Sequence, residues 1–202
     1  MEALTIYAIF VTIVILLYLC FDVHYFLRIL TTIGYGRIFE KRMKIDTQTE
    51  IYGICTTQDL DIFFKHMNNA RYLRELDFAR FHFYDRTGIY EEIKKVNGHA
   101  LQTATNIRYR RTIPLGDRYK VTTKLITWDE KTLYIEQQFI TLSDNFIRAI
   151  VWSKQNTIGL NVPEIMARLG SHDVSYRPPT PPELADWISS MEKSSASLRK
   201  KD

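Results

Sequence analysis

The stretch that most constrains the fold is 59–80, where a polar cluster runs directly into a helical pattern. From Ala70 onward, apolar residues recur at spacings of three and four, which places them on one helix face: Leu73, Leu76, Ala79 and Phe83. Asn68 and Asn69 stand where this helix should begin, and asparagine is a preferred N-cap residue. The pattern predicts a long helix over residues 68–86 that ends near Gly88, because glycine commonly terminates helices.

The polar cluster carries the groups that acyl transfer requires. Thioester hydrolysis needs a carboxylate, as nucleophile or as the base that activates water, and donors that hold the developing oxyanion. Asp61 offers the carboxylate and His66 the imidazole, while the helix start offers unpaired N–H groups with partial positive charge. The alternative interpretation is structural: these side chains terminate a strand and cap a helix.

The same stretch resembles the Asp-x-Asp…His-x-Asn-Asn-x-x-Tyr signature of hotdog-fold acyl-CoA and acyl-carrier-protein thioesterases, including the hydroxybenzoyl-CoA thioesterase-like group. The likeness is carried by His-Met-Asn-Asn-Ala-Arg-Tyr-Leu-Arg-Glu at 66–75, Asp-Phe-Ala-Arg at 77–80, Trp-Asp at 128–129 and Pro-Pro-Glu-Leu at 181–184. It covers roughly residues 50–190. The resemblance implies an α+β hotdog fold, in which an antiparallel sheet wraps around a central helix.

The resemblance also implies roles for the motif residues. Asp61 would be the nucleophile or base, His66 the proton carrier or donor, and Asn68 the residue that orients the water or the carboxylate. The second asparagine falls on Asn69, and the amides at the helix start would form the oxyanion site. This chain departs from the family pattern in two ways. Four residues rather than the usual three lie between Asp61 and His66, and Lys65 replaces the glycine that often stands just before the histidine. One extra residue in an extended segment reverses side-chain direction, so either the pair is misplaced or the loop bulges.

Asp77 is a second catalytic candidate, since some hotdog enzymes use an acidic residue on the central helix. It lies eleven residues beyond His66, which is about 16 Å along a helix. The two could not serve one carbonyl within a single chain, although hotdog dimers build sites from two subunits. The alternative is an ion pair of Asp77 with Arg74 or Arg80, at a spacing of three residues.

A basic segment offers candidates for binding the phosphates of coenzyme A, namely Arg108 and Arg110, with Lys124 further along. Strand alternation would place Arg108 and Arg110 on one face and Arg111 on the other. The alternative is a solvated strand face. Glycine-rich phosphate loops and a Gly-x-Ser-x-Gly elbow are absent from the sequence, so neither nucleotide hydrolysis nor an α/β-hydrolase is indicated, and we expect no cofactor.

Residues 3–21 carry no charge, and an apolar run of about 20 residues is long enough to span a bilayer. We therefore expect residues 1–22 to be a transmembrane anchor. Basic residues follow the run, which favours a cytosolic C-terminal domain. The resemblance suggests the endoplasmic reticulum membrane. The alternative is a cleaved signal peptide and a secreted protein.

Residues 23–46 form a basic juxtamembrane segment with two interpretations. It is either a helix that lies along the membrane surface, interrupted by Gly34 and Gly36, or a plain linker.

The hotdog domain is predicted over 47–160 from β-rich segments separated by turn sequences. These segments are 47–57 before the helix and 99–113, 117–128, 132–142 and 146–158 after it, with a short helical piece at 89–96. Residues 161–202 are predicted to be accessory: helices at 162–169 and 183–191, a proline-rich extended spacer at 177–182, and a disordered polar tail at 194–202.

Composition excludes several functional classes. The net charge is +4 and basic residues are mixed with acidic ones, so no nucleic-acid partner is expected. Two cysteines and five scattered histidines provide neither a disulfide framework nor metal-ligand spacing, so we expect no metal site.

The combined prediction is a membrane-anchored homodimer that hydrolyses fatty acyl-CoA or another acyl thioester and contacts membrane lipid. A catalytically silent acyl-lipid-binding or scaffolding protein of the same membrane is the alternative, favoured by the altered spacing before His66.

Overall fold

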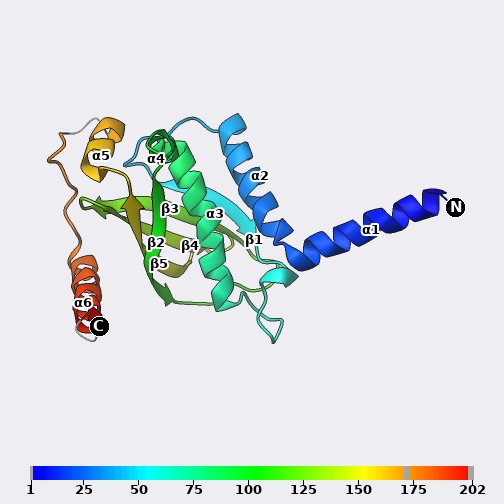
Figure 1. Cartoon of the computed structure of the whole chain (residues 1–202). Helices are drawn as coiled ribbons and strands as arrows, with labels where there is room; N and C mark the ends of the chain where they lie inside the picture. Colours follow the sequence, from blue (N-terminus) through cyan, green and yellow to red (C-terminus); the bar gives the residue numbers. More distant parts are fainter. Residues whose placement is uncertain (1, 171–172, 200–202) are drawn as a thin grey trace.

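An antiparallel sheet wrapped around one long helix forms the body of the protein (Figure 1). The computed structural model describes residues 2–170 and 173–199. In chain order the elements are α1 (Glu2–Cys20), α2 (Val23–Phe39), β1 (Thr49–Ile54), the 3-10 turn η1 (Thr57–Asp59), α3 (Asn69–Thr87), α4 (Ile89–Lys95), β2 (His99–Tyr109), β3 (Arg118–Trp128), β4 (Thr132–Thr141), β5 (Ile147–Ile158), α5 (Val162–Gly170) and α6 (Pro182–Arg199). The strand order is β1-β3-β4-β5-β2, with all neighbours antiparallel. This is the hotdog fold predicted from the sequence.

Helix α3 is the predicted central helix, with the predicted ends. The side chain of Asn68 accepts a hydrogen bond from the Ala70 N–H at 2.8 Å, which caps the first turn. Gly88 ends the helix with a φ of 87°, a left-handed conformation that glycine adopts without strain. The buried stripe is Tyr72, Leu76, Ala79 and Phe83. Leu76, Ala79 and Phe83 are therefore buried as predicted, but Leu73, also expected in that stripe, is 38% exposed, and Tyr72 takes its place in the first turns.

Two clusters of buried side chains fill the space between α3 and the sheet. The first surrounds the N-terminal half of α3 and includes Tyr72, Leu76, Tyr119, Val121, Phe139 and Val151. The second surrounds the C-terminal half and includes Phe83, Ile135, Ile165 and Met166. Ile165 and Met166 belong to helix α5, which therefore closes one end of the core.

Strand β2 is shorter than the sequence predicts. It ends at Tyr109 rather than at residue 113, because the chain turns away to pair with the loop that precedes α3. The N–H of Met67 donates to the carbonyl of Ile113 at 2.8 Å, and His66 forms a bridge with Pro114. This turn brings the end of β2 next to the start of α3.

Helix α2 packs along α3, which neither interpretation of the juxtamembrane segment anticipates (Figure 1). Two ion pairs join α2 to α3, Arg28–Glu75 and Arg37–Asp85. A third joins Arg74 of α3 to Asp22, the residue just before α2. They are spread along the length of α2. The helix is therefore held against the body at both ends.

The prediction that two glycines interrupt this segment is wrong. Helix α2 runs unbroken through Gly34 and Gly36. Gly36 is buried, and a Cβ at this position would lie 3.1 Å from the ring of His82. The absence of a side chain there lets α2 approach α3 closely, whereas a Cβ at Gly34 would meet nothing within 4 Å.

The two ends of the chain differ in their contacts. Helix α1 is long and apolar enough to cross a membrane, has no buried residue, and projects away from the body (Figure 1). Helix α6 buries Leu184 and extends to Arg199. The predicted disorder is therefore wrong for residues 194–199, and residues 200–202 lie outside the described part of the chain.

Candidate active site

The loop before α3 brings Asp61 and His66 together. An antiparallel bridge joins Leu60 to Met67, and the N–H of Asp61 donates to the carbonyl of His66 at 3.0 Å. Across this narrow loop the Nε2 of His66 lies 3.5 Å from the Oδ2 of Asp61. The Nδ1 of the same ring lies 3.3 Å from the Met67 carbonyl. With a proton on Nδ1 bound to that carbonyl, Nε2 faces the carboxylate, and a ring that takes up a second proton can donate it from Nε2 to Asp61.

The extra residue is absorbed by a turn at the tip of the loop. The N–H of Phe64 donates to the Asp61 carbonyl at 3.0 Å, and the N–H of Lys65 lies 3.3 Å from Asp61 Oδ1. Phe64 has a φ of 55°, in the left-handed region. That conformation costs a residue with a side chain about 1 kcal/mol or more. Of the two outcomes open from the sequence, the loop therefore bulges, and Asp61 still faces His66.

The tip of the loop exposes three apolar side chains in a row. Ile62, Phe63 and Phe64 are 82%, 74% and 71% exposed. Single exposed apolar residues are ordinary on protein surfaces, but a contiguous group of large ones marks a contact surface. This group lies directly beside the Asp61–His66 pair.

The two motif asparagines have separate structural duties. The side chain of Asn68 is engaged as the N-cap of α3, and its own N–H donates to the Asp59 carbonyl at 2.7 Å. Asn69 is exposed at the helix start, and its carbonyl accepts a hydrogen bond from the Tyr109 hydroxyl at 2.9 Å. The structural interpretation of Asn68 thus agrees with its contacts.

Asp59, the first aspartate of the motif, has a role that spacing alone does not reveal. It is buried, with one carboxylate oxygen bound by the N–H and hydroxyl of Thr56, each at 2.8 Å. Arg71 binds the other oxygen at 2.6 and 2.9 Å. Burial raises the pKa of Asp59, but these hydrogen bonds and the guanidinium outweigh burial and lower the pKa overall. Asp59 therefore fixes the loop through Thr56 and Arg71.

A small cavity lies between the start of α3 and the end of β2. Its volume is about 210 Å³, and it is lined by Met67, Asn69, Tyr72, Tyr109, Arg110, Arg111 and Thr112. The guanidinium groups of Arg110 and Arg111 both stack on the ring of Phe146. The cavity therefore combines apolar walls with two cations beside a helix N-terminus.

The three cations proposed for coenzyme A do not converge. Arg108 lines a different cavity, of about 400 Å³, on the sheet face opposite α3. Lys124 pairs with Glu136 at 2.9 Å, and Glu136 lines that second cavity. Arg110 belongs to the cavity at the helix start, because β2 has ended before it and the strand alternation no longer applies.

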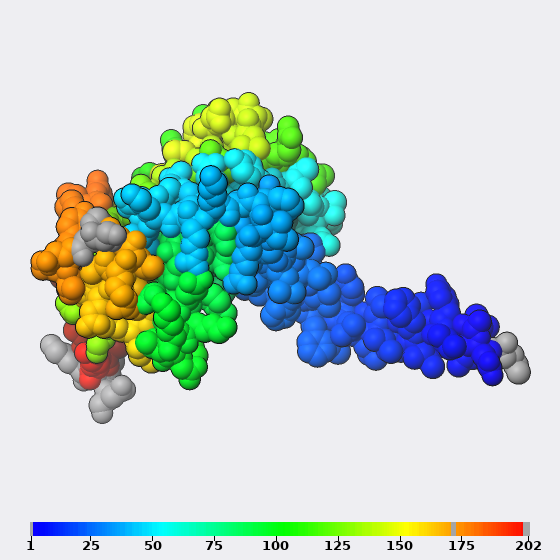
Figure 2. All heavy atoms as spheres, turned by 90° about the horizontal axis from the view of Figure 1, so that it is seen from above, coloured from blue at the N-terminus to red at the C-terminus, as the bar shows by residue number. Residues whose placement is uncertain are grey.

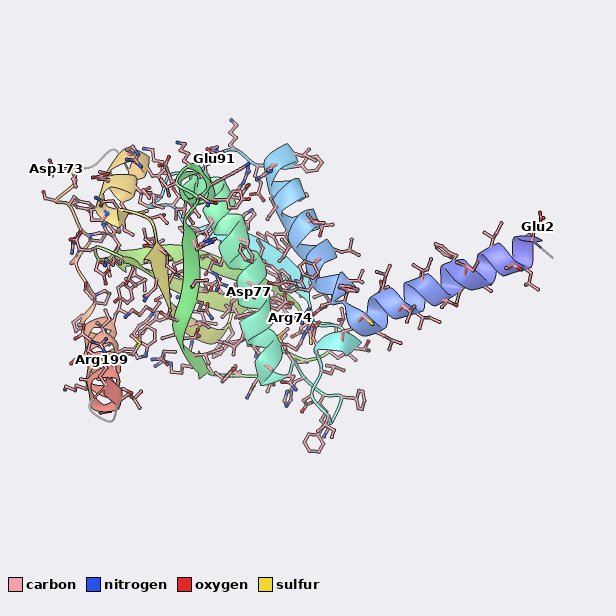
Figure 3. The ribbon with its side chains drawn as sticks, viewed as in Figure 1. Glu2, Arg74, Asp77, Glu91, Asp173 and Arg199 are labelled. Carbon is pink, nitrogen blue, oxygen red and sulfur yellow. The ribbon has the colours of Figure 1, made fainter. Side chains whose placement is uncertain are left out.

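Asp77 lies in the interface between α2 and α3. It forms an ion pair with Arg80, and its Oδ2 accepts a hydrogen bond from the Tyr25 hydroxyl at 3.2 Å. Figure 3 shows Asp77 and Arg74 near the middle of α3, away from the loop that carries His66. The ion pair with Arg80 agrees with the structural alternative for this residue.

Glu75 is a buried carboxylate whose role the sequence does not indicate. Its side chain is fully buried, and both of its oxygens are bound by Arg28 of α2, at 2.7 and 2.5 Å. The Tyr119 hydroxyl donates to it at 2.8 Å. Burial raises the pKa of Glu75 although Arg28 opposes the shift. The partners lie 47 and 44 positions away, so no local pattern could have identified this group.

The comparisons with known proteins agree with the fold. The sequence profile of the thioesterase-like superfamily matches residues 55–188. Protein THEM6 of Drosophila melanogaster is 53% identical over 188 residues, which cover 93% of this chain and 96% of that protein. Protein THEM6 of Danio rerio is 37% identical over 186 residues, covering 92% and 91%. The crystal structure of the probable thioesterase YbaW from Escherichia coli has a TM-score of 0.50 and 26% identity, over 57% of this chain and 84% of that chain. This chain belongs to the thioesterase-like superfamily.

Proposed function

We propose that this protein is a membrane-anchored thioesterase that hydrolyses fatty acyl-CoA. The observation that carries the proposal is the Asp61–His66 pair, held 3.5 Å apart in the loop that leads into α3. Hydrogen bonds of catalytic groups are often long before substrate binds and shorten in the reacting complex. Asp61 acts as nucleophile or as base toward water, and His66 carries the proton to the leaving thiolate.

The start of α3 supplies the electrostatic part of the mechanism. The developing oxyanion is stabilised by the partial positive charge and N–H groups of this helix end. The side chain of Asn68 supports this arrangement by capping the helix. Asn69, which is exposed, is the asparagine that meets the substrate.

The substrate class follows from what surrounds the pair. The exposed side chains of Ile62, Phe63 and Phe64 provide an apolar contact for an acyl chain. Arg110, in the cavity at the helix start, provides a cation for the phosphates of coenzyme A. Arg108 and Lys124 lie elsewhere and would need a second part of the ligand or a second subunit to contribute.

We further propose a homodimer formed along β2. This strand is 11 residues long and lies at the edge of the sheet, paired on one side with β5. A long unpaired strand edge is a template for pairing with another chain. A second copy would cover this edge and bring a partner surface to the cavity beside Tyr109.

The membrane location rests on α1, whose length and composition suit a bilayer span. The exposed basic residues Lys41 and Lys44, which follow α2, support a cytosolic location of the domain, because basic residues beside a membrane span favour the cytosolic side. The endoplasmic reticulum is the proposed compartment. Mass spectrometry of the mature N-terminus tests the anchor, since loss of residues 1 to about 21 would show a cleaved signal peptide and a secreted protein.

The test of activity is thiol release from a series of acyl-CoAs by the full chain in detergent micelles. The protein should retain α2, because its removal would leave the buried Glu75 without Arg28. We expect Asp61→Asn and His66→Gln each to lose at least tenfold in kcat/KM, which corresponds to about 1.4 kcal/mol. Asp46→Asn, at an exposed carboxylate outside the site, should leave the rate unchanged.

The alternative function is an acyl-lipid-binding or scaffolding protein without turnover. One observation favours it: Asp61 also accepts the N–H of Lys65 within its own loop, which reduces its availability as a nucleophile. A folded full-length protein that releases no thiol from any acyl-CoA, yet binds them in equilibrium titrations, would replace the enzyme by this second function.

A further inference from the structure

Helix α2 presents a large apolar face to the outside of the molecule. The exposed side chains on this face are Phe26, Leu27, Leu30, Tyr35, Ile38 and Phe39, each between 51% and 74% exposed. Figure 2 shows α2 on the surface of the body, with no other element covering its outer side in that view. A face of this size is an interaction surface rather than a set of isolated exposed residues.

The opposite face of α2 is bound to the body and fixes how the helix is turned. Arg28 binds Glu75, and Arg37 binds Asp85 at 2.6 Å. These two arginines are the charged residues of α2, and both are engaged in ion pairs with α3. The outward arc therefore carries no charge without a partner. The ion pairs prevent the helix from rolling to hide its apolar side chains.

The place of α2 in the chain indicates what covers this face. Two residues, Phe21 and Asp22, separate it from α1, the candidate membrane span. Figure 1 shows α1 projecting from the body and α2 turning sharply from it to run across that side of the body. If α1 crosses the bilayer, α2 begins at the bilayer surface and runs along it.

The charges that flank α2 fit a lipid surface. Lys41 and Lys44 follow the helix and are exposed. Basic side chains beside an apolar helix face are typical of helices that lie at the headgroup level, where they meet anionic lipid. A protein partner on this face would not explain why the apolar face directly follows a candidate membrane span.

We propose that α2 lies in the plane of the membrane surface, with its outer face among the lipid headgroups and upper acyl chains. This inference rests on the anchoring role of α1 proposed above. Such helices bury their apolar face about 5–10 Å into the headgroup boundary. The ion pairs to α3 then hold the whole domain in one orientation, with α2 against the bilayer and α6 directed away from it (Figure 1).

The test uses the full chain in lipid vesicles that contain anionic lipid, with Cys20→Ser to remove the exposed native thiol. An environment-sensitive fluorophore is attached at one introduced cysteine: Ile13→Cys in α1, Leu30→Cys in α2, or Leu198→Cys in α6. The last two are matched, because Leu30 and Leu198 are 67% and 64% exposed. Spin-labelled lipids with the label at shallow or deep positions then quench the fluorophore.

We expect shallow-labelled lipid to quench the Leu30→Cys probe at least severalfold more than the Leu198→Cys probe, and deep-labelled lipid to quench the Ile13→Cys probe. Equal quenching at Leu30→Cys and Leu198→Cys, with Ile13→Cys quenched, would overturn the inference and leave the anchor standing. Quenching of the Leu30→Cys probe without quenching of the Ile13→Cys probe would support the surface position of α2 but overturn the anchor from which we argue it. Disulfide crosslinking between two Leu30→Cys chains in vesicles, without quenching, would assign the face to a second copy and overturn the proposal.

Discussion

Substitution of Arg28 by methionine should destabilise the protein more than any other loss of a single ion pair between α2 and α3. Arg28 binds both oxygens of Glu75, whose side chain is fully buried. Methionine keeps most of the side-chain volume but leaves that carboxylate without its cation. Removal of one partner from a buried ion pair costs about 3–5 kcal/mol. The lower end applies here, because the side chain of Arg28 is itself 20% exposed.

The expected loss is about 3 kcal/mol in the free energy of unfolding, or roughly 6–12 °C in Tm for a domain of this size. The assay is thermal unfolding of the full chain in micelles, followed by tryptophan fluorescence; Trp128 is buried and reports on the core. Arg37→Met is the matched control on the same helix. Its partner Asp85 retains Arg86 at 2.5 Å, so the control should cost less than about 1 kcal/mol.

The pH dependence follows from the pKa of Glu75, which burial raises in the folded protein. Between the unfolded and folded pKa values the folded state binds more protons, so stability falls as the pH rises through that window. Arg28 lowers the pKa of Glu75, so its loss raises that pKa further and widens the pH range between the unfolded and folded values. The Tm difference between Arg28→Met and wild type should therefore be smaller at about pH 5 than at about pH 8.

A second variant separates the ion pair from general packing. Glu75→Gln in the Arg28→Met background removes the uncompensated charge and can retain the contact to Tyr119. It should recover at least half of the lost stability. The reasoning would be refuted if Arg28→Met cost no more than Arg37→Met, or if the double substitution were as unstable as the sum of the single ones.

The remaining predictions concern local geometry. Gly36→Val should lower the Tm, because a Cβ at this position would lie 3.1 Å from the His82 ring. Gly34→Ala, at an open position of the same helix, should instead stabilise the protein by about 0.5–1 kcal/mol. Equal shifts in Tm for the two variants would contradict the close contact at Gly36. Asn68→Ala should cost about 1 kcal/mol in denaturant unfolding, through loss of the α3 cap, and Asn68→Asp should preserve it; lost activity at unchanged stability would instead give Asn68 a chemical role. Phe64→Asn should slow proteolysis of the loop, because asparagine tolerates the left-handed φ of 55°; faster cleavage would argue against strain there.

Much of the fold was predictable because its signals are local. The period of three to four residues, the cap at Asn68 and the stop at Gly88 define α3 within about one residue. Strands β3, β4 and β5 follow from β-rich segments between turn sequences. The end of β2 was missed, because the chain leaves the sheet there to pair with Met67, a contact between residues far apart in sequence.

The sequence singled out Asp61 and His66, which the loop brings together, but it also singled out Asp77, Arg108 and Lys124, which lie elsewhere. The motif identifies Asp61 and His66, yet the spacing leaves their mutual orientation open. The left-handed turn at Phe64 settles the orientation. The cations diverge for a similar reason: Arg108 is still in the strand, and Arg110 lies just beyond its end, in another cavity. Alternation predicts side-chain direction only while the strand continues.

By itself, the amino-acid sequence determined the order of the elements, the apolar length of α1 and the motif that joins the loop to α3. These features depend on the periodicity and composition of neighbouring residues. The tertiary structure alone decided that α2 packs on α3 and that Glu75 is paired with Arg28. Both depend on groups separated by tens of residues, which meet only because the sheet and α3 bring them to one face. Long-range contacts of this kind leave no periodic trace in the sequence.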